Sequence, residues 1–176
     1  RITRIAETLM LLTSLESRNA VENTDPVALD RITADATESL GVLAERRGLV
    51  FDYTGVEPVT ILGDGVLIRQ AALHLLQNAV EFSPPGGVIS ITTRSLDDVI
   101  EFEVRDHGPG IPAYAESKVC DRFFSLTRPH SGKKSSGLGL SLVSEIMTLH
   151  EGSVVVTSHP DGGALAKLVF PRVIAG

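Results

Sequence analysis

The sequence has little of several residue types that mark particular classes of protein. Aromatic residues make up 5% of the 176 residues, and there is one cysteine. That residue, Cys120, cannot form an internal disulfide, which excludes a disulfide-stabilised scaffold and fits a reducing compartment. No apolar run approaches the ~20 residues that span a bilayer, and no signal-peptide pattern is present. These absences leave an ordinary globular domain as the expectation.

Positive charge is also scarce. The chain has 16 lysines and arginines against 22 acidic residues, for a net charge of −6. A protein that binds a nucleic-acid duplex needs a dominant basic surface, so nucleic acid is excluded as the main partner. Because 43% of the residues are hydrophobic and 22% are charged, the chain can bury one core, and we expect one domain with an appendage.

Two helices are predicted before Gly48, which ends the second one. In the first helix, apolar residues step by 3, 4 and 3 positions from Ile2 to Leu12, a spacing typical of coiled coils. This helix is either a surface helix that needs a partner or the end of a dimerisation hairpin. We expect Asp25 to cap the second helix, with Pro26 in its first turn. The division is then a hairpin part over 1–24 and a domain over 25–176, and the helical start at Arg1 predicts that the parent protein continues upstream.

The remaining chain alternates β-like and helical patterns. Strands are predicted over 49–53, 59–62, 88–93, 99–104, 153–157 and 164–170, with helices over 65–82 and 138–150 and an irregular glycine-rich stretch over 106–136. The strand 99–104 has one apolar and one polar face, which indicates a sheet that is covered on one side. The fold class is therefore α+β: a two-layer sandwich in which helices cover one face of a mixed, mostly antiparallel sheet, preceded by an N-terminal helix.

Three segments carry candidate chemistry. On the helix 65–82, the residues His74, Asn78, Glu81 and Phe82 share one stripe, and an amide among leucines and alanines needs a specific partner. A satisfied core asparagine is the alternative.

The second segment is Asp106-His107-Gly108-Pro109-Gly110-Ile111, after a strand. A carboxylate there can accept a hydrogen bond from an exocyclic amine, and glycines let backbone approach a flat ring, although ordinary turns also contain aspartate and glycine.

The third segment, 135–140, opens a helix with two glycines, which suits phosphate binding by free backbone amides. An ordinary helix entry is the alternative. The stretch before it, 122–134, carries Arg122, Arg128, Lys133 and Lys134 and no acid. In an acidic protein, this local excess of positive charge suits an anionic ligand.

The combination is more specific than its parts. In order, the chain carries N-A-x-x-F, D-x-G-x-G-I, R-F-F and S-G-L-G-L at a helix start. This order resembles the histidine-kinase branch of the GHKL ATPases, a group that also includes gyrase and MutL. The four segments are similar to the N, G1, F and G2 boxes of that branch, over residues 25–172. Residues 124–145 are also similar to the CreC-type sensor kinases.

The resemblance implies a Bergerat-type ATP-binding fold and a kinase domain that binds Mg-ATP. Asn78 would coordinate Mg²⁺, Asp106 would read the adenine amine, and a basic lid would cover the phosphates. The resemblance implies no catalytic side chain in this chain. The residues implied to contact ATP are His74, Asn78, Glu81, Phe82, Asp106, Gly108, Gly110, Ile111, Arg122, Phe123, Lys133, Lys134, Ser135, Ser136, Gly137, Leu138, Gly139 and Leu140.

The chain departs from the family pattern at two positions. Four residues before Asn78 the family usually has asparagine, and this chain has His74, which would either contact the ligand or fill space. Three residues after Asn78 a lysine is common, and this chain has Glu81. A GHKL hydrolase, a GHKL serine kinase and a degenerate, non-catalytic interaction module are the alternatives.

None of the five histidines lies in the helix context of a phospho-accepting histidine. By resemblance, the γ-phosphate would pass to a histidine on an upstream hairpin and then to the receiver domain of a response regulator. The full-length protein would be a homodimer, and this part of it would be the cytoplasmic domain of a sensor anchored in the inner membrane.

Overall fold

A five-stranded mixed sheet forms one layer of the fold. The structure, a computed structural model, describes residues 2–173. The strand order is β2-β4-β5-β7-β6, in which only the β2–β4 pair is parallel. The strands are β2 (Val50–Val56), β4 (Val88–Ser95), β5 (Val99–Arg105), β6 (Ser153–Ser158) and β7 (Ala164–Pro171).

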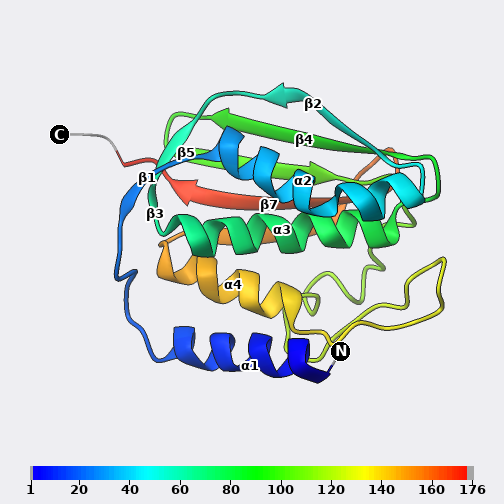
Figure 1. The fold of residues 1–176 in the computed structure, drawn as a ribbon, viewed down its shortest axis with the longest axis horizontal. Helices are drawn as coiled ribbons and strands as arrows, with labels where there is room; N and C mark the ends of the chain where they lie inside the picture. Colours follow the sequence, from blue (N-terminus) through cyan, green and yellow to red (C-terminus); the bar gives the residue numbers. More distant parts are fainter. Residues whose placement is uncertain (1, 174–176) are drawn as a thin grey trace.

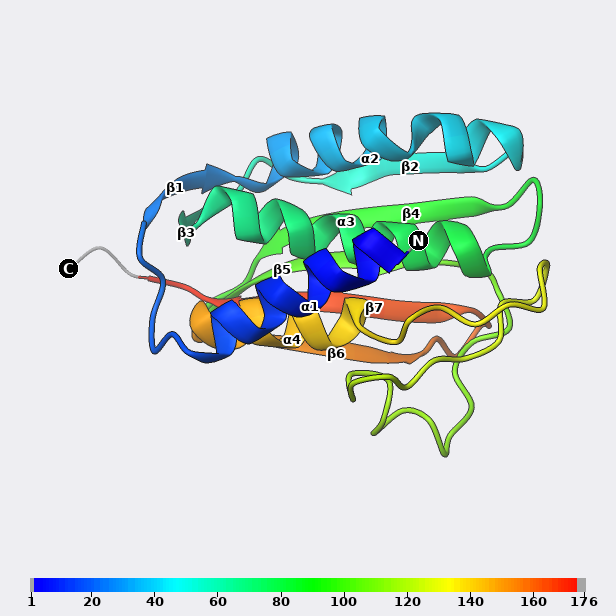
Figure 2. The ribbon, with the colours of Figure 1, turned by 60° about the horizontal axis from the view of Figure 1, so that its bottom comes forward.

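Three helices, α2 (Leu29–Arg46), α3 (Gly65–Phe82) and α4 (Gly139–Leu149), cover one face of this sheet (Figures 1 and 2). Alternate residues of β4 and β5 point into the layer between sheet and helices, where Ile91 and Phe102 are at most 1% exposed. On the opposite face of β5, Glu101, Glu103 and Arg105 are polar and half-buried, as the alternation predicted. The expected two-layer α+β arrangement is confirmed.

Helix α3 is the central helix and carries one of the predicted site segments. It begins where expected, because the Oδ1 atom of Asp64 accepts hydrogen bonds from the amides of Val66 and Leu67, at 3.0 and 3.1 Å. The start of α3 is joined to the end of α4 by His150, whose Nε2 accepts from the Asp64 amide at 3.0 Å while its Nδ1 donates to the Ile146 carbonyl at 2.7 Å. The two helices therefore run antiparallel, and the end of α3 lies beside the start of α4.

The prediction of a helix capped by Asp25 is wrong. Residues Asp25–Ala28 form a strand, β1, that pairs antiparallel with β3 (Thr60–Gly63). Helix α2 begins only at Leu29, whose amide donates to the carbonyl of Val59 at 2.9 Å. Pairing with β3 satisfies more backbone groups than one capping side chain, and Pro26 is compatible with an edge strand because it has no amide hydrogen to leave unpaired.

Helix α1 (Ile2–Glu16) packs on α4 (Figures 1 and 2). The predicted apolar stripe is divided, because Leu12 is fully buried whereas Ile2 is 84% exposed. Leu15, which lay outside the predicted stripe, is also fully buried. Helix α1 therefore has one apolar edge that packs on α4 and a second apolar edge that faces solvent. Whether it belongs to a dimerisation hairpin stays a prediction.

Candidate functional site

A cavity of about 590 Å³ lies where the end of α3 meets the start of α4 and the ends of the central strands. This volume is in the range of small-molecule sites. The loop 106–138 runs along the same end of the molecule (Figure 1). The predicted site residues that line the cavity are His74, Asn78, Glu81, Phe82, Asp106, Gly110, Ile111, Lys133, Lys134, Ser135, Ser136, Gly137, Gly139 and Leu140.

Four predicted residues lie outside the lining. The side chain of Arg122 forms an ion pair with Glu16 of α1, and Phe123 is 66% exposed. Leu138, the residue directly before α4, is fully buried. Gly108 packs under the end of α3, where a Cβ would overlap the carbonyl oxygen of Phe82. Gly108 therefore lets the loop approach the helix.

Asp106 lies at the end of β5 and is held by backbone groups from two directions. Its Oδ1 accepts from the amides of Gly108, at 2.9 Å, and Ala164, at 3.1 Å. The residue is 6% exposed, and this burial raises the pKa of the carboxyl group, against the opposing effect of the two hydrogen bonds. Because Oδ1 is occupied, Oδ2 is the oxygen that is left to meet a ligand.

Asn78 and His74 project from α3 into the same cavity. Within residues 2–173, the amide of Asn78 has no hydrogen-bond partner, so it is available to a ligand. His74 lies one turn earlier, beside Gly139 at the start of α4, with Nε2 3.5 Å from Nε2 of Gln70. Burial lowers the pKa of His74, which favours the neutral imidazole.

The start of α4 meets both ends of the loop 124–136, which is called the lid below. The amide of Phe123 donates to the carbonyl of Gly137 at 2.9 Å, and both residues have positive φ angles, of 63° and 74°. A Cβ on Gly137 would overlap the backbone of Phe123, so only glycine allows this approach. Helix α4 has no side-chain cap. Its first amides are therefore left open toward the cavity.

Several lining residues had no distinctive signal in the sequence. Arg4, Ile5 and Thr8 come from α1, which the sequence did not connect with the site. Arg128 was noted only as part of a basic stretch. Gln77 is adjacent to Asn78 and lies on the same cavity wall. The floor consists of small or apolar residues of β5, β6 and β7, which periodicity assigns only to the covered face: Val104, Val156, Ala164 and Ala166.

The family model described as "Histidine kinase-, DNA gyrase B-, and HSP90-like ATPase" matches residues 63–174, more than half of the chain. The chain belongs to this family. The match covers α3, the cavity loops, α4 and four of the five central strands, which are the elements that form the site.

Relatives agree with this assignment. The sensor protein CreC of Escherichia coli is 38% identical over 174 residues, which are 98% of this chain and 36% of that protein. The solved structure of the mycobacterial sensor histidine kinase MprB is 30% identical, with a TM-score of 0.72 over 84% of this chain and 96% of that one. Full-length ShkA in complex with AMPPNP, 23% identical, gives a TM-score of 0.82 over 99% of this chain and 37% of that one.

The chain is thus the ATP-binding catalytic domain of a two-component sensor histidine kinase, with the expected GHKL-type fold. The narrower similarity to CreC agrees with the sequence expectation. The chain spans about a third of the length of the curated relatives that it matches. Over residues 2–173, no helix is long and apolar enough to cross a membrane.

Proposed function

We propose that the cavity binds Mg-ATP, with the base at Asp106 and the phosphates between Asn78, the start of α4 and the lid. The observation that carries this proposal is the amide of Asn78, which lines the cavity without a hydrogen-bond partner in residues 2–173. A polar group in an apolar helix face needs a partner to offset its desolvation. A bound ligand supplies one.

The two ends of the cavity suit the two ends of the nucleotide. At one end, Asp106 has a free carboxylate oxygen next to apolar walls such as Ile111 and Val104, which fits a purine with an exocyclic amine. At the other end, Lys133 and Lys134 line the cavity beside the uncapped start of α4. Lysines and open helix amides favour phosphate oxygens.

The donor set at Asn78 fits Mg²⁺. A hard cation that keeps much of its water shell could bind one amide oxygen together with phosphate oxygens and water. When bound, the ion neutralises charge that develops on the transferring phosphoryl group. Asn78 would hold it, while Lys133, Lys134 and the amides of Gly137 and Gly139 would orient the phosphates.

The phosphoryl acceptor lies outside this domain. We infer that the γ-phosphate passes to a histidine on an upstream helical hairpin, whose last helix would include α1, and then to the receiver domain of a response regulator. The dimerisation of that hairpin would make the full-length protein a homodimer. Phosphoryl transfer of this kind depends on positioning and charge neutralisation. The groups assigned above to the metal and the phosphates would supply both.

Phosphotransfer to a separately purified acceptor hairpin tests this function. With ATP labelled on the γ-phosphate, we expect Mg-dependent label on the hairpin, and none on a hairpin whose acceptor histidine is replaced by glutamine. Nucleotide binding without transfer would favour a non-catalytic interaction module. Release of inorganic phosphate without label on the hairpin would favour a hydrolase.

A further inference from the structure

Glu81 is an acidic residue on the wall that the proposed function assigns to the phosphates. It lies in the last turn of α3, three residues after Asn78, with a side chain that is 17% exposed. No lining residue of α3, all of which the structure describes, is lysine or arginine. A carboxylate there would repel a triphosphate, unless another residue neutralises its charge.

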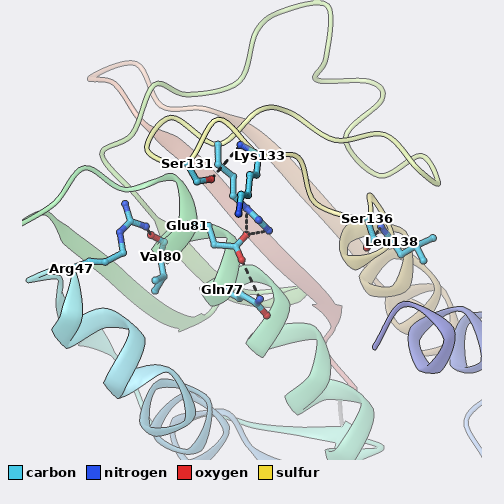
Figure 3. A network of polar contacts seen from close by, with 9 residues as sticks. Arg47, Gln77, Val80, Glu81, Ser131, Lys133, Ser136 and Leu138 are labelled. Carbon is cyan, nitrogen blue, oxygen red and sulfur yellow. Dashed lines mark hydrogen bonds and ion pairs between the residues drawn. The ribbon is translucent and has the colours of Figure 1, made fainter. Parts of the chain in front are cut away.

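The neutralising residue is Arg128 of the lid, 47 positions further along the chain. Its Nε and Nη2 atoms donate to the Oε2 atom of Glu81, at 2.8 and 2.7 Å. The other oxygen, Oε1, accepts from Nε2 of Gln77 at 3.2 Å (Figure 3). Both oxygens of the carboxylate are therefore engaged by protein groups.

Both sides of this ion pair are fixed. On the helix side, Arg47 donates to the carbonyls of Val80 and Ser83 and so holds the end of α3. On the lid side, the Arg128 amide donates to the Lys133 carbonyl at 3.0 Å, which closes the loop 128–133. Figure 3 shows Lys133 above Glu81, on the same side as Ser131.

Arg128 keeps hydrogen-bonding capacity after it has paired with Glu81. A guanidinium has five N–H donors, and Nη1 has no partner among residues 2–173. The side chain is 24% exposed and lines the cavity together with Lys133 and Lys134. A planar guanidinium suits bidentate binding of phosphate oxygens.

We propose that Arg128 is a phosphate-binding residue of this domain and that Glu81 is its positioning residue. In this arrangement the positively charged side chain at this wall is Arg128 of the lid, and Glu81 holds its guanidinium against α3. This proposal rests on the proposed function. It makes a specific claim about charge: the position next to Glu81 needs a cation, whichever element supplies it.

Three variants separate this role from a purely structural tether. Arg128→Gln removes the cation, Glu81→Gln frees it from α3, and the double variant Arg128→Gln with Glu81→Lys moves a cation onto α3 without restoring an ion pair. The affinities for Mg-ATP and adenosine are measured by calorimetry for each protein. The control is Arg94→Gln, which removes an ion pair with Glu103, 3.8 Å away on the sheet face opposite the helices.

We expect Arg128→Gln to weaken the binding of Mg-ATP by about ten- to a hundredfold, as for the loss of a charge-assisted hydrogen bond. The affinity for adenosine should stay unchanged. Glu81→Gln should cause a smaller loss, and the double variant should regain most of the affinity for Mg-ATP. The control should bind like the native protein. A double variant as weak as Arg128→Gln would show that the pair only tethers the lid, and would overturn the proposal.

Hydrogen exchange of the nucleotide-free proteins tests the pair without any ligand. Glu81→Gln should speed exchange in residues 124–136, and Arg94→Gln should not. Unchanged exchange in Glu81→Gln would overturn the positioning role. Native Mg-ATP affinity in Arg128→Gln would overturn the phosphate role alone, whereas a native protein that fails to bind Mg-ATP would contradict the proposed function as well.

Discussion

The two ends of the cavity are held in different ways. At the Asp106 end, backbone amides from two segments fix the carboxylate, and glycines allow the loops to touch. At the lid end, residues 124–136 are attached by the Phe123–Gly137 pairing and by the Glu81–Arg128 ion pair. The end assigned to the base is therefore part of the rigid sheet, whereas the end assigned to the phosphates depends on charged side chains and responds to the charge of a ligand.

The largest expected difference between the two ends concerns stability, and two glycines test it. Gly163 and Gly132 have positive φ angles of 83° and 63°, so alanine strains either backbone by about 1–2 kcal/mol. At Gly163 the added Cβ would also overlap the carbonyl of Asp106, whereas at Gly132 it would meet nothing within 4 Å. Gly163→Ala should therefore cost about 1–3 kcal/mol more than Gly132→Ala. Urea unfolding measures both, and equal losses would contradict a rigid base end.

The next effect concerns binding at the base end. Asp106→Asn should weaken ATP binding by about 1.5–3 kcal/mol, or about one to two decades in affinity, because a charge-assisted hydrogen bond from the base amine is lost. Inorganic triphosphate, which has no base, should bind the variant and the native protein equally. If ATP and triphosphate lose the same affinity, Asp106 does not read the base.

The smallest effect is the pH dependence that His74 contributes. Burial lowers its pKa below 6.5, so the folded protein binds this proton less readily than the unfolded chain. The free energy of unfolding should therefore fall as pH drops from about 6.5 through the folded-state pKa. His74→Asn should flatten this decline in urea titrations between about pH 5 and 7.5. An unchanged pH profile would show that His74 does not titrate differently on folding.

Nucleotide binding should shift the pKa of His74 in the opposite direction, upward. A triphosphate stabilises the imidazolium and raises the pKa, so Mg-ATP affinity should strengthen as pH falls in the native protein and less in His74→Asn. If affinity instead weakens on acidification only in the native protein, a neutral His74 holds the metal or its water. Identical profiles would leave His74 as a residue that packs between α3 and α4.

Periodicity predicted most of the fold because most elements follow it. The alternation in 99–104 and the helix over 65–82 follow from residues that are near in sequence, and the structure has both. The prediction at Asp25 failed because its two local signals, a capping residue and a following proline, also fit an edge strand. Only the partner strand β3, more than 30 residues away, decides between these possibilities.

The lining of the candidate site was predictable where glycines and polar residues stand out in the sequence, as at Asn78 and Asp106. It was not predictable where distant segments meet. Glu81 stood out in the sequence only as a departure from the common lysine, and nothing there connected it with Arg128, which lies in an irregular loop without a register. Thr8 of α1 reaches the cavity only because α1 folds onto α4.

The account depends most on Asn78 as the group that binds the metal of Mg-ATP. Calorimetric titration of the nucleotide with and without Mg²⁺, for the native protein and Asn78→Asp, tests this directly, with circular dichroism to verify that the variant is folded. We predict that Mg²⁺ strengthens ATP binding to the native protein and that a folded Asn78→Asp loses this Mg-dependent binding, because the added carboxylate repels the phosphates and changes the metal ligand. Unchanged Mg-ATP affinity in the folded variant would contradict the assignment.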